Sequence, residues 1–147
     1  VGYCNVIPLW NGAGTVKCVI ADSNNKPASD TLIQTVKTFL DEEAPIGADV
    51  TVATYAQSNL NVEAKVVLNG ELSLDEVKTR YKNAIEDYLG DIAFDTKLIS
   101  YAKMIGLLVS IVGVKDCTEL TLNGASQNIL LNVDELYVLD NLTLSLA

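Results

Sequence analysis

The chain has 147 residues, of which 49% are hydrophobic, and this length and composition are sufficient for a folded domain with an apolar core. Its formal net charge is −9, so its surface repels phosphate backbones and anionic lipid, and we expect no nucleic-acid partner and no membrane partner. No apolar run reaches the ~18 residues of a membrane-spanning helix. The absence of histidine removes the commonest general base and the commonest metal ligand.

Two apolar segments, residues 3–9 and 15–21, flank a loop rich in glycine and asparagine, which predicts an antiparallel hairpin. Pro8 has no N–H to donate to a ladder, so we expect the first strand at a sheet edge. The first residue is Val1 and not methionine, and we expect the chain to be a piece of a longer protein.

The three cysteines are too few and too far apart in sequence for a zinc site or a disulfide framework. A regular ladder around the hairpin loop would pair Ile7 with Cys18 and Ala21 with Cys4. The thiols of Cys4 and Cys18 would then point to opposite faces of the sheet and could not bond. We therefore interpret these two residues and Cys117 as reduced, mostly buried, small hydrophobic side chains.

Ser29 is placed to cap a helix that runs to about Glu43. One apolar stripe at helical spacing lies along this helix and comprises Leu32, Ile33, Val36, Phe39 and Leu40. Residues 50–52 and 60–68 then alternate between apolar and polar side chains, which predicts two strands with one buried face each. The segment between them is short, so we expect the two strands to be antiparallel neighbours in one sheet.

A second helix follows, because Ser73 and Glu76 have the spacing of a capping box; we place its end at about Leu89, with Gly90 just past it. Ser100 is placed to cap a third helix from Tyr101 to about Ile111, which is apolar nearly all round and is therefore expected to be largely buried. The remaining predicted strands are residues 97–99, 115–122, 129–131, 136–139 and 142–146.

This order of elements predicts an α+β fold with a ferredoxin-like βαββαβ core, in which helices cover a mostly antiparallel sheet. An extra N-terminal strand, an extra helix and C-terminal strands would be added to it. We expect a single domain over residues 1–147, with its core at about 14–122. The N-terminal hairpin strand at 3–9 and a β-rich extension at 123–147 would flank that core.

Several short motifs follow one another in an order that identifies a family. They are PLWNGAGTV (residues 8–16), KPAS (26–29), APIGADV (44–50), LDEV (74–77), GVKD (113–116) and LTLNG (120–124). Each motif alone is weak, but the succession resembles the C-terminal part of baseplate J-like proteins, including the XkdT-like proteins of PBSX-type prophages. It extends over nearly the whole chain.

The resemblance implies a structural wedge subunit in the baseplate of a contractile phage tail or related tail-like particle. It implies assembly in the bacterial host cytoplasm, contacts with other baseplate and tail subunits, and self-association in a ring. The family offers no catalytic residues to transfer, so we expect no enzymatic activity, no cofactor and no metal.

Two other functions compete with this interpretation. A ferredoxin-like domain is also compatible with a regulatory module that binds a small ligand, although fold alone does not establish such a role. The acidic clusters at residues 41–43 and 86–87 could in principle hold a metal, but without histidine a solvated face is the simpler account.

Trp10 is the single tryptophan, and it lies beside Pro8 and Leu9 in the predicted hairpin loop. Tryptophan is enriched at the energetic centres of protein interfaces, so Pro8, Leu9 and Trp10 are our candidate interface residues. The sequence leaves a second possibility open, in which Trp10 covers the core of the same chain.

Overall fold

The computed structural model describes residues 1–24, 26–93 and 97–147, and these residues form two compact units, Val1–Gln57 and Ser58–Ala147. We expected one domain over residues 1–147, and the expected core at 14–122 extends across both units. Whether the two units unfold as one cooperative domain stays a prediction for unfolding experiments. None of the helices in the described part of the chain is long and apolar enough to span a bilayer.

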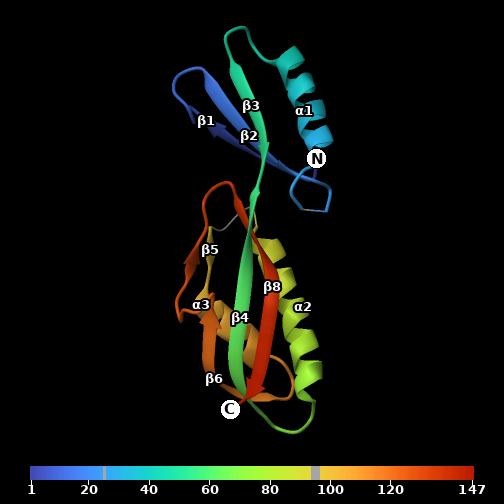
Figure 1. Cartoon of the computed structure of the whole chain (residues 1–147), viewed down its shortest axis with the longest axis vertical. Helices are drawn as coiled ribbons and strands as arrows, with labels where there is room; N and C mark the ends of the chain where they lie inside the picture. Colours follow the sequence, from blue (N-terminus) through green and yellow to red (C-terminus); the bar gives the residue numbers. More distant parts are fainter. Residues whose placement is uncertain (25, 94–96) are drawn as a thin grey trace. The chain divides into compact units, whose positions relative to one another are not determined.

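The first unit is a three-stranded sheet with one helix, in the order β1-β2-β3 (Figure 1). Strands β1 (Tyr3–Pro8) and β2 (Thr15–Ala21) are antiparallel, and β2 is parallel to β3 (Asp49–Thr54). Helix α1 (Asp30–Glu43) connects the parallel pair, as a crossover between parallel strands requires. Its N-terminus is capped by Ser29, whose side chain accepts a hydrogen bond from the backbone N–H of Leu32 at 3.3 Å.

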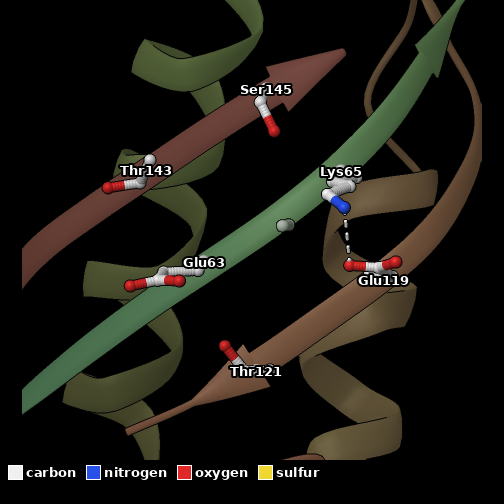
Figure 2. Close-up of a pocket in the computed structure, with 7 residues that line it drawn as sticks. Glu63, Lys65, Glu119, Thr121, Thr143 and Ser145 are labelled. Carbon is white, nitrogen blue, oxygen red and sulfur yellow. Dashed lines mark ion pairs between the residues drawn. The ribbon is translucent and has the colours of Figure 1, made fainter. Parts of the chain in front are cut away.

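The second unit contains a sheet of order β6-β4-β8 and a small two-stranded sheet, β5-β7. Strand β4 (Ala56–Leu68) is central and antiparallel to β6 (Val114–Leu122), whereas β8 (Glu135–Leu146) runs in the same direction as β4 (Figure 2). Helices α2 (Leu74–Ile92) and α3 (Tyr101–Val109) lie behind one face of this sheet. Strands β5 (Leu98–Ile99) and β7 (Ile129–Leu130) are antiparallel.

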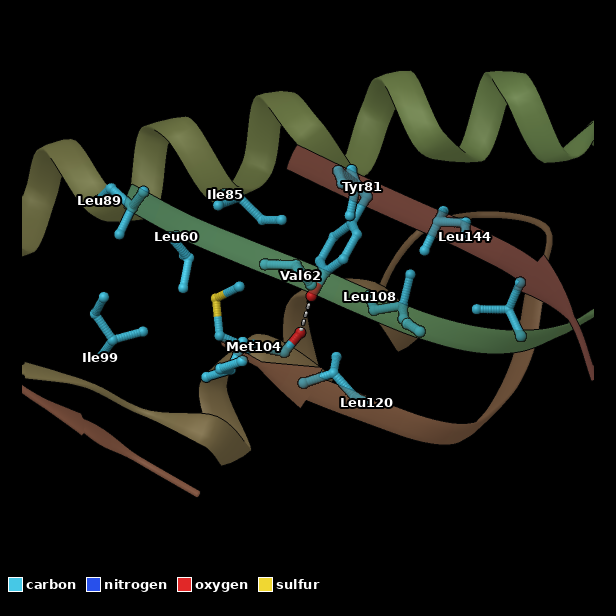
Figure 3. Close-up of a cluster of buried hydrophobic side chains, with 14 of the residues drawn as sticks. Leu60, Val62, Tyr81, Ile85, Leu89, Ile99, Met104, Leu108, Leu120 and Leu144 are labelled. Carbon is cyan, nitrogen blue, oxygen red and sulfur yellow. Dashed lines mark hydrogen bonds between the residues drawn. The ribbon is translucent and has the colours of Figure 1, made fainter. Parts of the chain in front are cut away.

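One hydrophobic core fills the space between this sheet and its helices (Figure 3). Strand β4 contributes Leu60, Val62, Ala64 and Val66, all buried, while the intervening polar residues are exposed. This is the pattern that the alternating sequence predicts for a strand with one buried face. Tyr81 of α2 is fully buried within the core, and its hydroxyl donates a hydrogen bond to the backbone carbonyl of Met104 in α3 at 3.0 Å.

The predicted helix starts are confirmed. The capping box is present, because the Ser73 side chain accepts from the Glu76 N–H at 3.3 Å and the Glu76 carboxylate accepts from the Ser73 N–H at 2.8 Å. Ser100 caps α3 by accepting from the Lys103 N–H at 3.2 Å. These starts depend on side chains within three residues of the helix, so sequence alone is sufficient to identify them.

The α+β class is confirmed, but the ferredoxin-like arrangement is not. Strands β3 and β4, which we expected to be antiparallel neighbours, belong to two different sheets and are separated only by Tyr55. The neighbours of β4 are β6 and β8, which come from the distant C-terminal third of the chain. Two alternating strands close in sequence suggest a hairpin, but the pattern of each strand does not specify its partner.

The hairpin is confirmed, but its register differs by one residue from the expected one. Val6 lies opposite Cys18, and Cys4 lies opposite Ile20. Leu9 has a positive φ of 56°, so it leaves the strand conformation. The loop between the two strands therefore contains one residue more than the expected regular ladder would leave. A shift of one residue turns every side chain to the other face, so Cys4 and Cys18 share a face, contrary to our expectation.

The three thiols are free in this structure, and their burial differs. Cys18 is buried and Cys117 is half-buried, but Cys4 is exposed, so the expectation of mostly buried cysteines is wrong for Cys4. Partial burial, followed by the neighbouring Cys18 thiol, raises the pKa of Cys4. Burial, followed by the nearby Asp116 carboxylate, raises the pKa of Cys117.

Three other details differ. Helix α2 continues through Gly90 to Ile92, because burial of Ile92 outweighs the ~1 kcal/mol that glycine costs inside a helix. Helix α3 ends at Val109, and only Met104 and Leu108 in it are fully buried. The last two predicted strands are one continuous strand, β8.

Candidate assembly surface

The β1–β2 loop holds its backbone in one conformation through hydrogen bonds that converge on Thr15. The Thr15 carbonyl accepts from the Leu9 N–H at 2.8 Å, and its side-chain hydroxyl donates to the Gly12 carbonyl at 2.7 Å. The same hydroxyl oxygen accepts from the Asn11 N–H at 3.1 Å. The loop is therefore ordered before any partner binds, which lowers the entropic cost of docking.

This loop presents the three candidate interface residues to solvent. Leu9 is 67% exposed, Trp10 is 44% exposed, and Pro8 is exposed. The Nζ atom of Lys17 lies 5.3 Å from the centroid of the Trp10 ring, within the range of a cation–π contact. An indole with almost half of its surface in water is poorly suited to cover a core, so the structure favours the interface interpretation, which stays a prediction.

A second apolar group lies beside this loop. The Asp49 N–H donates to the Gly14 carbonyl at 2.8 Å, which joins the β1–β2 loop to the segment between α1 and β3. That segment carries Ile46, which is fully exposed, and Gly47 takes a φ of 91° to make the turn. We call Leu9, Trp10 and Ile46 together the apolar end of the first unit.

Sequence reasoning missed Ile46 as an interface candidate, and it placed Phe39 on the inward stripe of α1. Phe39 is 60% exposed, and no residue of α1 is fully buried. A single helix over a three-stranded sheet covers only part of that sheet's apolar width. The signal that could have identified Ile46 was its position between Pro45 and Gly47, since a turn of that kind projects its central side chain into solvent.

One face of the sheet in the second unit carries polar side chains, most of which are exposed (Figure 2). It forms a shallow depression of about 120 Å³, lined by Glu63, Ala64, Lys65, Glu119, Thr121, Thr143 and Ser145. The Lys65 Nζ and Glu119 Oε2 atoms form a cross-strand ion pair at 3.0 Å, with both side chains exposed. Small-molecule sites usually enclose roughly 300–1,000 Å³, so this face is suited to surface contact and not to enclosing a ligand.

A larger hollow, of about 460 Å³, lies along α1 and is lined by Asp30, Thr31, Gln34, Thr35 and Thr38. All five come from one exposed face of a single helix, so no second wall encloses it. In the described part of the chain, no three side chains of His, Cys, Asp or Glu lie close enough together to hold a metal ion. Both hollows are therefore open surfaces suited to contact.

Comparisons with known proteins agree with this division of the chain. Residues 1–54 match the model of the baseplate J-like central domain, and residues 60–145 match that of the baseplate J-like protein C-terminal domain. These ranges correspond to the two compact units.

Two relatives from Bacillus subtilis strain 168 are each 34% identical to this chain. They are YqbT, over 143 residues, and XkdT, a protein of the phage-like element PBSX, over 139 residues. The matches cover 92% and 90% of this chain but 41% and 40% of the relatives, so the chain spans about two fifths of their length.

A solved structure has the same fold. It is the cryo-EM structure of the anti-feeding prophage baseplate, which matches 89% of this chain and 30% of the other chain with a TM-score of 0.67. Identity is 11%, so this likeness shows the fold alone. The two family models confirm the resemblance drawn from the ordered motifs, and the chain belongs to the baseplate J-like family, of which it carries the central and C-terminal domains.

Proposed function

We propose that this chain is a structural part of the baseplate of a contractile phage tail or prophage tail-like particle. The observation that carries the proposal is the match of both compact units to consecutive baseplate J-like domains. The ordered, solvent-exposed β1–β2 loop supports a role in contact with other subunits. In this role the protein acts by binding its neighbours, without a catalytic step or a cofactor.

The partners we propose are other baseplate and tail subunits, which the chain meets in the host cytoplasm during assembly. A net charge of −9 opposes binding to the phosphate backbone of the packaged or host nucleic acid. The apolar end of the first unit is the contact surface that we assign, because Leu9, Trp10 and Ile46 expose large side chains on a backbone that hydrogen bonds already order.

The test deletes the gene for the parent protein in a bacterium that carries the element and then induces particle production. We expect electron microscopy to show tubes and sheaths without complete baseplates, and restoration of whole particles by the wild-type gene. A gene carrying Trp10→Ala should restore fewer particles than one carrying Leu130→Ala, which truncates another exposed leucine in the second unit. Normal particles from the deletion strain would contradict the structural role.

A further inference from the structure

Three Asn-Gly pairs lie in connecting segments of the chain, namely Asn11-Gly12, Asn69-Gly70 and Asn123-Gly124. In such a pair the backbone nitrogen of the glycine can attack the side-chain carbonyl carbon Cγ of the asparagine, because glycine has no Cβ to shield that nitrogen. Leucine precedes both the second and the third asparagine, so these two sites share the tripeptide Leu-Asn-Gly. A difference in reactivity between them therefore reports on the fold and not on the residue at either side.

At Asn69 the fold holds the reacting atoms together. The Asn69 Oδ1 atom accepts a hydrogen bond from the backbone N–H of Glu71 at 2.9 Å. This bond folds the side chain back over its own backbone, so Cγ is held close to the nitrogen of Gly70, which lies between the two bonded residues. The same N–H stabilises the negative charge that develops on Oδ1 during an attack on Cγ.

The surroundings of Asn69 leave the attack unobstructed. Asn69 and Gly70 are exposed, and no described residue accepts a hydrogen bond from the Gly70 N–H or from the Asn69 side-chain amide. The space where a Cβ of Gly70 would lie is open. The Asn69 N–H donates to the Gly113 carbonyl at 2.9 Å, which fixes the backbone of the residue under attack. Reacting atoms that are held in place in this way react faster than freely moving ones.

The same tripeptide at Asn123 is held in an unreactive arrangement. The Asn123 Oδ1 atom accepts from the Asn61 N–H at 2.8 Å, and its Nδ2 atom donates to the Asn59 carbonyl at 3.3 Å. Both ends of the side-chain amide are thus bound to strand β4. An attack by the Gly124 nitrogen requires these hydrogen bonds to break, which raises the barrier.

Asn11 lies between these two cases. No described residue forms a hydrogen bond with its side-chain amide, so Cγ is free to move. The Gly12 N–H, however, donates to the Leu9 carbonyl at 3.2 Å, and this bond occupies the nitrogen that would attack.

We propose that Asn69 is a site of spontaneous deamidation and that the hydrogen bonds of Asn123 protect it from the same reaction. The Gly70 nitrogen forms a bond to Cγ of Asn69, the bond from Cγ to Nδ2 breaks, and the proton of the Gly70 N–H leaves with Nδ2 as ammonia. Water then opens the resulting succinimide ring at one of its two carbonyl carbons, which gives aspartate or isoaspartate. This inference goes beyond the proposed function and does not depend on it.

The reaction changes the connection between strand β4 and helix α2. Either product places a new negative charge at residue 69, close to Glu71 and ahead of the capping box that begins at Ser73. Isoaspartate also adds one CH2 group to the main chain of this connection. The chain therefore acquires a modified form with time, without an enzyme.

The experiment incubates the folded 147-residue chain at neutral pH and follows the three Asn-Gly peptides by digestion and mass spectrometry, since OH replaces NH2 in the product. A methyltransferase specific for isoaspartate labels the same peptides as a second readout. We expect Asn69 to react about tenfold or more faster than Asn123, with Asn11 between them, because hydrogen bonds must break at Asn123. Equal rates, or a faster reaction at Asn123, would overturn the proposal.

The chain unfolded in urea is the matched control. Asn69 and Asn123 should then react at similar rates, because the tripeptide is the same and the hydrogen bonds are lost. A difference that persists unchanged in urea would refute the structural explanation. In Asn69→Gln the attack must close a larger ring, so the isoaspartate signal of this peptide should disappear; an unchanged signal would show that the modified residue is not Asn69.

Discussion

The hydroxyl of Tyr81 gives a sharp test of the core of the second unit. The side chain is fully buried, and its hydroxyl donates to the Met104 carbonyl at 3.0 Å. Tyr81→Phe removes that donor and keeps the ring. The Met104 carbonyl can still accept from the Leu108 N–H within α3, so no backbone acceptor is left without a partner.

The expected loss is therefore the net value of one buried hydrogen bond, about 1 kcal/mol of unfolding free energy. For a unit of this size that corresponds to a decrease in Tm of about 4–8 °C. Urea unfolding followed by circular dichroism measures the loss. The matched control is Thr79→Val, since the Thr79 hydroxyl donates to the Asp75 carbonyl of the same helix at 3.1 Å but is exposed, and its loss should stay within ~0.5 kcal/mol.

A second measurement uses alkaline pH. Burial, with a smaller effect of Cys117, raises the pKa of the Tyr81 hydroxyl above its ordinary value of about 10. The un-ionised hydroxyl is favoured in the folded state, so its contribution to stability is present below pH ~10 and is lost as the pH rises beyond it. Tyr81→Phe should lose less stability than the wild type over that range. Equal stability of the two proteins at neutral pH would refute the buried hydrogen bond.

Four further predictions concern other parts of the chain. Trp10→Ala should cost less than about 1 kcal/mol of stability, because only partial burial and one cation–π contact are lost; a larger loss would identify Trp10 as core. Ser73→Ala should cost about 1 kcal/mol by removing the helix cap. Hydrogen bonds from Ser73 lower the pKa of Glu76, so its carboxylate stabilises the folded state at pH values above the unfolded pKa of about 4.3. This stabilisation is lost as the pH falls through the pKa of the folded state. In Glu76→Gln, the free energy of unfolding should therefore depend less on pH under acidic conditions. The raised pKa of Cys4 should make its alkylation at neutral pH slower than that of an unstructured cysteine peptide, measured by mass spectrometry; an equal rate would contradict it.

The candidate surface was only partly predictable. Pro8, Leu9 and Trp10 were identifiable because a lone tryptophan in a hairpin loop is a local feature of the sequence. Ile46 was not, because its proximity to that loop depends on the parallel pairing of β2 with β3, 34 residues away along the chain.

The sequence by itself determined the features that neighbouring residues establish. The caps at Ser29, Ser73 and Ser100 and the two-residue alternation of β4 are of this kind, because a hydrogen bond across three residues or a pleat of period two needs no distant partner. Tertiary structure decided which strands pair. Strand β4 pairs with β6 and β8 and not with β3. Its alternating apolar residues could be buried beside any strand with a matching apolar face, so the pattern does not select a partner. The partners are determined by the core that α2 and α3 complete.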